Sequence, residues 1–456
     1  MTSIALGQMR RSPAAFVGLA VALFLAIATL TLFGTLFATE VTAPAAVRKG
    51  VVGPGLMVIA GAFGEISVLV AFFVVVNALG FAIRQQHREL ALLRTIAATP
   101  RQARRLVRGQ VVAATLLMTV PGWVAGAGAA RIVLTELQRR GMAASGLRVP
   151  GTPVPMLIAL VAVLAVGLAA SAVAASRISR IAPAVALTAT STEHGRTGAL
   201  RLLAAIVALV GGGLLLRLAA TRPAEQLDKA GQAALLGSLV LLIAVALAGP
   251  LAARVLAAAL GAPIRALMPG TGWLADANLR GYARRLSSAV VPIALLVGLC
   301  GTMMIMTSTA EHATGATGTS VTSATDVWLR QAELALLTCF AAVSTVNTLI
   351  AVTADRRREF ALLRLVGATR SQLLRMLTAE AGLTSAVAVL LGSAVAGAAS
   401  AAFSTAVTGS AMPSVPMASC GWIVAGAVAL TMPSILVTGL RAVRGPAAEL
   451  VGGGRD

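Results

Sequence analysis

The sequence predicts an all-α integral membrane protein with about ten transmembrane helices, arranged as two four-helix repeats with two extra helices between them (4+2+4). Three observations predict this fold class. Of the 456 residues, 58% are hydrophobic and only 12% are charged, whereas soluble domains carry about 25% charged residues. Apolar runs of about twenty residues, which are long enough to cross a bilayer as a helix, recur along the chain. An arginine-rich polar segment occurs twice, 270 residues apart.

Ten apolar runs are the expected spans. The first follows Arg10 and Arg11, so a cleaved signal peptide is the alternative for that run. Its apolar core is about twice as long as that of a signal peptide, and no clear cleavage site follows it, so we expect a retained anchor. The ten runs are Ala14–Phe37, Leu56–Ile83, Val107–Ile132, Val154–Ala175, Leu200–Ala219, Ala233–Val255, Ala289–Ser308, Leu329–Thr353, Leu377–Phe403 and Gly421–Leu440.

The distribution of charge predicts the topology. The formal net charge is +21, which in a soluble protein would suggest nucleic-acid binding. Ten spans with both chain ends in the cytoplasm place most of the basic residues on the cytoplasmic side, which is the positive-inside pattern. Four arginines run against it: Arg131, Arg139, Arg140 and Arg148. Because basic and aromatic residues are not interleaved, we expect no nucleic-acid partner.

The chain shows no pattern typical of an enzyme or a metal site. Its two lysines, Lys49 and Lys229, are followed by Gly50 and Ala230, so neither fits a phosphate-binding P-loop. We expect no catalytic residue, no metal and no cofactor in this chain. The residues that could suggest a metal are scattered without ligand spacing: Cys300, Cys339, Cys420, His87, His194 and His312.

The two arginine-rich segments indicate an internal repeat. The match includes charged and polar residues, which the apolar composition does not favour. We therefore expect a first four-helix unit at 1–190, a linker with two extra helices at 191–265 and a second four-helix unit at 266–456. The aligned pairs are Asn77/Asn347, Leu79/Leu349, Arg88-Glu89/Arg358-Glu359, Ala91-Leu92-Leu93-Arg94/Ala361-Leu362-Leu363-Arg364, Ala98-Thr99/Ala368-Thr369, Gln102/Gln372 and Arg105/Arg375.

Each repeated segment is predicted to be an amphipathic helix at the cytoplasmic face, because it is too short and too charged to cross the bilayer. In the second copy Phe360, Leu363 and Val366 form the apolar stripe. Gly367 to Thr369 indicates a break, after which a second short helix begins with Thr369 as its N-cap. Anionic lipid headgroups would explain the arginines. A soluble partner explains Glu89 and Glu359 better, because an acid is unfavourable at an anionic surface.

The Arg-Glu-x-Ala-Leu-Leu-Arg-x-x-Gly/Ala-Ala-Thr-x-x-Gln pattern, with one span before it and two after it, resembles the FtsX-like permease family. These are the membrane subunits of ATP-binding-cassette transporters such as macrolide exporters, lipoprotein-releasing permeases and peptide-resistance permeases. The resemblance implies that each repeated segment is a coupling helix for an ATPase subunit. By position, the first copy would contact one ATPase through Arg88, Glu89, Leu92, Leu93 and Arg94, and the second copy another through Arg358, Glu359, Leu362, Leu363 and Arg364.

The resemblance also implies the partners and the location. Two ATPase copies would bind one permease chain, and ATP and magnesium would be bound by those ATPases. The location would be the bacterial plasma (inner) membrane, with both termini cytoplasmic. Many family members carry a large extracytoplasmic domain between the first two helices of a half. Here the two connections, Ala38 to Gly55 and Thr309 to Val327, have only about twenty residues, so functions that need such a domain are not expected.

The expected function is export, or extraction from the outer leaflet, of an amphiphilic substrate such as a drug, an antimicrobial peptide or a lipid-like molecule. Glu65 and Glu333 lie at nearly equivalent places in the two halves, and acids within spans are often functional. They either face the outer interface or form an acidic patch for a cationic substrate. Two alternatives stay open, namely a secondary transporter driven by an ion gradient and a regulatory protein that transmits ATPase motion without transport.

Overall fold

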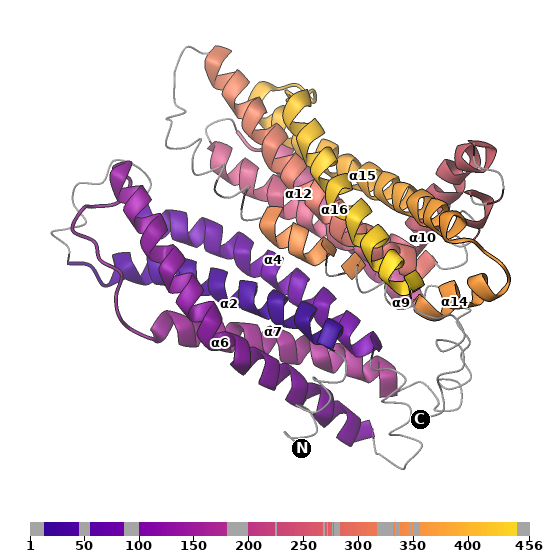
Figure 1. Ribbon diagram of the computed structural model, residues 1–456. Coiled ribbons are helices and arrows are strands. Elements are labelled where there is room, and N and C mark those ends of the chain that lie inside the picture. The colour runs from indigo at the N-terminus through magenta and orange to yellow at the C-terminus, as the bar shows by residue number, and fades with distance from the viewer. Residues whose placement is uncertain are drawn as a thin grey trace. The chain divides into compact units, whose positions relative to one another are not determined.

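The computed structural model describes residues 13–44, 55–85, 100–179, 199–223, 226–267, 283–316 and 356–444, together with 338–346 and a few further positions in 270–277 and 332–349. Within these residues the regular secondary structure is helical and no strand occurs. The chain divides into two compact units, Met1–Thr190 and Ser191–Asp456 (Figure 1). Each unit is described by itself.

Among its described residues the first unit contains four long helices, and the first of them contacts the other three. The third helix begins at Pro100, where a proline suits the first helical position because its missing N–H needs no partner there. This helix therefore starts several residues before the apolar run that predicted it. The helices are α2 (Pro13–Val41), α4 (Gly55–Gln85), α6 (Pro100–Arg139) and α7 (Val154–Ser179).

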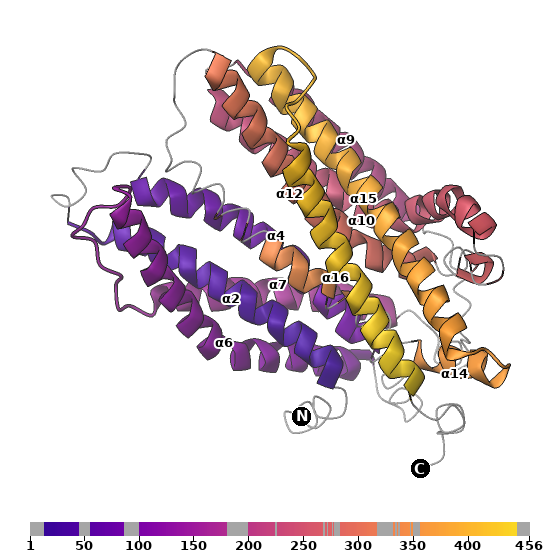
Figure 2. The ribbon, with the colours of Figure 1, turned by 45° about the horizontal axis from the view of Figure 1, so that its top comes forward.

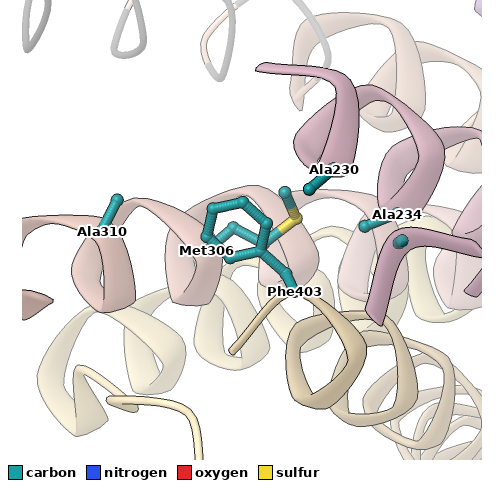
Figure 3. Close-up of a cluster of buried hydrophobic side chains, with 6 residues drawn as sticks. Ala230, Ala234, Met306, Ala310 and Phe403 are labelled. Carbon is teal, nitrogen blue, oxygen red and sulfur yellow. The ribbon is translucent and has the colours of Figure 1, made fainter. Parts of the chain in front are cut away.

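The second unit contains five long helices and one short helix among the described residues. They are α9 (Ala199–Ala220), α10 (Leu227–Leu267), α12 (Ala283–Ala316), α14 (Arg357–Leu365), α15 (Arg370–Thr408) and α16 (Met417–Arg444). α9 and α10 correspond to the expected linker, yet both pack against α15, and α10 also packs against α12. Figure 3 shows part of this contact, where the side chains of Met306 and Phe403 lie beside Ala230 and Ala234 of α10.

Seven of the described helices are long and apolar enough to cross a membrane, which makes the chain a multi-pass membrane protein. They correspond to the first, third, fifth, sixth, seventh, ninth and tenth predicted runs. The second run is the 31-residue helix α4, and the fourth run lies in α7, whose apolar part is the shorter stretch Val154–Ala169. The eighth run, Leu329–Thr353, is described only in part, and its longest described stretch, 338–346, is helical.

Glycines bring the first and third helices of each half into close contact. A methyl group placed on Gly126 of α6 would lie 2.3 Å from the carbonyl oxygen of Ala28 in α2, and one on Gly122 would lie 2.9 Å from Ile27. In the second unit, a methyl group on Gly392 of α15 would lie 2.8 Å from the carbonyl oxygen of Ala294 and from Val297 of α12. Small residues allow such backbone approach, which stabilises helix pairs in lipid.

The glycine contact of the second unit involves residues that lie 270 positions after those of the glycine contact in the first unit. The two arginine-rich segments have the same spacing. Gly122 lies on α6 against Phe24 and Ile27, and Gly392 lies on α15 against Ala294 and Val297. Each second-half residue follows its counterpart by 270 positions. The same spacing relates Gly126 and Thr31, which are in contact, to Ala396 and Gly301, which are also in contact. Equal spacing of both contact partners is what an internal repeat predicts.

Arg201 of α9 forms hydrogen bonds with two backbone carbonyls of α10. Its Nε donates a hydrogen bond to the carbonyl oxygen of Leu247 at 2.9 Å, and its Nη2 donates to that of Ala246 at 3.0 Å. The Ala246 carbonyl faces Pro250 one turn later, which has no N–H to donate. Arg201 in α9 supplies the missing donor, because an unpaired carbonyl is costly in a membrane helix. An arginine that the sequence assigned to the positive-inside pattern thus has a structural role.

The ends of some helices carry polar contacts of their own. In the second unit the Ser414 hydroxyl lies 3.1 Å from His312 Nδ1, and the Ser414 amide donates to Thr309 Oγ1 at 3.1 Å. These bonds tie the end of α12 to the connection between α15 and α16. In the first unit Arg140 pairs with Glu136 at 2.9 Å, so part of the charge that opposes the predicted topology is balanced locally.

We predict that Gly126→Ala lowers the stability of the purified protein by about 1–3 kcal/mol, because the added methyl group overpacks the α2–α6 contact. The matched control is Gly128→Ala, two residues along the same helix, where an added methyl group meets nothing within 4 Å. Thermal unfolding in detergent measures both variants. Equal melting temperatures for the two variants would contradict close packing at Gly126.

We also predict that Arg201→Leu lowers stability by about 1–3 kcal/mol, because it leaves the part-buried Ala246 carbonyl without a donor. Pro250→Ala restores an N–H for the Ala246 carbonyl. The double variant should therefore lose less than the sum of the two single variants, as expected for groups in one hydrogen-bond network. Additive losses in a double-mutant cycle of thermal unfolding would refute the proposed role of Arg201.

Candidate functional site

The second arginine-rich segment forms helix α14 and the first turns of α15. Figure 2 shows α14 at the end of α15 that lies far from the α15–α16 connection. Gly367 has a φ of 99°, which only glycine adopts readily. Thr369 is the N-cap of α15 in a capping box, with the Thr369 amide donating to Gln372 Oε1 at 2.9 Å. The predicted break and N-cap are therefore confirmed.

The helix after the break is not short, which corrects the prediction. α15 continues from Arg370 to Thr408 as one helix of 39 residues, and this helix is one of the candidate spans. Helical hydrogen bonds continue across the change from polar to apolar sequence, because propagation costs little once a helix is formed. As a consequence, the turn that follows α14 is joined directly to a transmembrane helix.

One face of α14 is buried and another exposes apolar side chains. Phe360 and Ala361 are buried, and α14 packs against α16. Leu362, Leu365 and Val366 are exposed by 47%, 56% and 88%. We call these three residues the α14 patch. The predicted stripe of Phe360, Leu363 and Val366 is wrong, because the helix ends at Leu365 and Val366 leaves the helical register as the C-cap.

A buried arginine fixes the start of α14. Arg356 is 5% exposed and precedes the helix. Its Nη2 donates to Glu359 Oε1 at 2.8 Å and to Glu380 Oε1 at 3.1 Å. Its Nε donates to Glu359 Oε2 at 3.1 Å, and its Nη1 donates to Glu380 Oε2. The guanidinium carbon also lies 4.8 Å from the centre of the Phe360 ring, within range of a cation–π contact.

The environment of Arg356 favours the protonated, positively charged guanidinium. Burial tends to lower the pKa of the Arg356 guanidinium, but the negative charges and hydrogen bonds of Glu380 and then Glu359 outweigh that effect, so the net shift of the pKa is upward. Arg356 is thus protonated and bridges α14 to α15. The bridge is a charge-assisted contact with fork geometry, which fixes direction as well as distance.

Glu359 has a different position from the one the sequence suggested. Its side chain is 28% exposed and pairs with Arg356 of the same chain. Because Glu359 already has a partner within the chain, its negative charge does not by itself indicate a soluble partner. Leu362 is exposed as a docking residue should be, whereas Leu363 and Arg364 are half-buried.

The remaining predicted site residues are only partly visible. Arg358 lies in α14 but its side chain is outside the description, as is that of Glu65 in α4. Glu333 and the whole first-copy set (Arg88, Glu89, Leu92, Leu93 and Arg94) fall outside the described residues. Within the described part of the chain, no group of three or more His, Cys, Asp or Glu residues could hold a metal ion.

The sequence analysis missed Arg356 and Glu380. The signal was present, because Glu380 is an acid inside the predicted span Leu377–Phe403, and such acids are expensive unless they are paired. Its partner could not be found from helical spacing, since Arg356 lies 24 residues earlier, on the other side of the turn.

Comparison with known proteins identifies two regions of the chain. A family model described as "FtsX-like permease C-terminal" matches residues 61–183 and 333–447. Together these regions make up more than half of the 456 residues. The second region includes all of α14, α15 and α16, and the first includes α6 and α7. No match is found among curated proteins.

We predict that Gly367→Ala loosens α14, because a left-handed backbone costs a residue with a Cβ about 1–2 kcal/mol. Amide hydrogen exchange of α14 should become several-fold faster, since the free energy of local opening falls by about this amount. Gly397→Ala is the control, because an added methyl group there meets nothing within 4 Å and the backbone is helical. Unchanged exchange in α14 would mean that the turn does not depend on Gly367.

Proposed function

Because the chain belongs to the FtsX-like permease family, we propose that it is the membrane subunit of an ATP-binding-cassette transporter and that α14 is a docking element for a separate ATPase. Permeases of this family are membrane components that pair with ATPase subunits. The observation that carries the docking proposal is the α14 patch, which exposes three apolar side chains on a helix fixed by a buried ion pair.

The surroundings of the patch suggest the chemistry of its partner. Arg370 and Arg375 are exposed in the first turns of α15, and Arg364 is half-buried at the end of α14. An apolar patch with a basic rim fits an apolar groove with acidic residues around it. A lipid surface would also accept this combination, but a helix that only lies in headgroups does not need a buried ion pair to fix its direction.

The repeat suggests two docking elements in one chain. The same family model matches twice, and the glycine contacts of the two halves share one spacing. By position, Arg88, Glu89, Leu92, Leu93 and Arg94 would face one ATPase. Arg358, Glu359, Leu362, Leu363 and Arg364 would face a second, with Glu359 also positioning the helix. ATP and magnesium would be bound by these partners and not by this chain.

The substrate is proposed to be an amphiphile that is exported or extracted from the outer leaflet. The short connections after the first and seventh predicted spans support this proposal, since they leave no room for a large substrate-holding domain. Glu65 and Glu333 are the candidate substrate-facing acids. The corresponding topology has both termini in the cytoplasm of a bacterial cell, with α14 on the cytoplasmic side.

The docking proposal predicts that Leu362→Glu combined with Val366→Glu abolishes co-purification of the permease with an ATP-binding-cassette ATPase that co-purifies with the wild type, because two charges would enter an apolar interface. Met412→Glu is the matched control, since Met412 is 85% exposed beyond the opposite end of α15. Co-purification in nanodiscs and ATP turnover are measured. If the double variant binds and stimulates the ATPase like the wild type, α14 is not the docking element.

A further inference from the structure

The Arg356–Glu380 pair lies at the only covalent connection between the proposed docking helix and the span that follows it. Residues 366–369 join α14 to α15, and the ion pair bridges the same two helices through side chains. Both side chains are 6% exposed. The turn alone would act as a hinge at Gly367, so the ion pair adds a second attachment that opposes rotation about that hinge.

Stability alone does not explain such a pair. Buried ion pairs lose much of their attraction to desolvation, and apolar replacements of similar volume are often as stable. What a guanidinium fork supplies is a fixed direction, because it binds two carboxylates in one plane. Arg356 contacts Glu359 on α14 and Glu380 on α15 at the same time. The geometry is therefore that of a joint that holds two helices at one angle.

The first half carries different residues at the corresponding positions. At 270 residues before Arg356 and Glu380 stand Gln86 and Gln110. Gln110 is 3% exposed in α6, so the buried polar position is kept while its charge is lost. The position of Gly367 is taken by Ala97, which adopts a left-handed backbone only at a cost. The residues that build the joint and its hinge are thus specific to the second half.

We propose that Arg356 and Glu380 form a charged joint through which movement of α14 is passed to α15. The ATPase contact in the second half would therefore be coupled to its transmembrane helices more strongly than the contact in the first half. This inference rests on the proposed docking function. Arg356 and Glu380 are positioning residues, since they act through the direction of α14 and not by contact with ATP or substrate. A hydrogen bond to a charged group is stronger than a neutral one, so the neutral residues at the two corresponding positions of the first half would restrain a helix less firmly.

The test compares matched apolar replacements in the two halves. Arg356→Met with Glu380→Leu removes the charged joint while keeping its volume, and Gln86→Met with Gln110→Leu makes the corresponding change in the first half. Each full-length variant is reconstituted in nanodiscs with the ATPase that co-purifies with the wild type. The measurements are co-purification, the kcat and KM of ATP turnover, and amide hydrogen exchange of α14.

The second-half variant should still bind the ATPase but lower the stimulated kcat about tenfold, the factor that about 1.4 kcal/mol of lost coupling produces. The KM for ATP should not change, because ATP binds to the partner. Exchange in α14 should become faster while the middle of α15 stays protected. The first-half variant should stay near the wild-type kcat. Arg356→Lys keeps the charge without the fork and should fall between the wild type and the second-half variant.

Three outcomes would overturn the inference. If the second-half variant keeps the wild-type kcat and α14 exchange, there is no joint. If both variants lose turnover equally, the two halves are not coupled unequally. If Arg356→Lys behaves like the wild type, the fork geometry is not what matters. Failure of the docking proposal looks different, because the variant with Leu362→Glu and Val366→Glu would then still bind and stimulate the ATPase like the wild type. The exchange of α14 would still report on the joint in that case.

Discussion

The close approach of the first and third helices in each half is the constraint on which the rest depends. In lipid there is little hydrophobic drive to bring helices together, so association relies on packing and polar contacts. Gly126 against Ala28, and Gly392 against Ala294, allow backbones to meet where any side chain would interfere. In the second unit this contact places α12 at the centre, and 94% of the residues in the most apolar stretch of α12 are buried. α10, α15 and α16 pack against α12, α9 packs against α10 and α15, and α14 is held at the end of α15.

Much of this fold follows from the sequence because lipid allows few solutions. A run of about twenty apolar residues must form a helix that satisfies its own backbone, so most predicted runs correspond to helices. Helix ends were harder, since polar residues such as Arg370 and Gln372 continue a helix that the apolar pattern begins only at Leu377. The packing of α9 against α15, and of α10 against α12 and α15, was not predictable, because a purely apolar helix such as Leu200–Ala219 carries no mark of its partner.

The candidate site was predictable in position but not in detail. Repetition of charged residues located α14, and Gly367 with Thr369 located its end. The roles within it were assigned less well, because a helix of nine residues is too short to impose its own register. Its direction is set by tertiary contacts, namely Arg356 with Glu380 and the buried Phe360. Glu359 consequently belongs to the internal support of the helix, and the exposed patch is shifted from the predicted stripe toward Leu362, Leu365 and Val366.

The same reasoning explains why a charged joint suits a docking helix. A nine-residue helix that is held by its turn alone would tilt about Gly367 when a partner pushes on the α14 patch, and the push would be lost as rotation. Apolar packing resists compression but allows sliding, because it has no preferred direction. A guanidinium that is bound to carboxylates on two helices resists tilt and sliding together, so the displacement must move the start of α15 as well. Since α15 packs closely against α12 along its length, a shift at its first turn reaches the centre of the second unit.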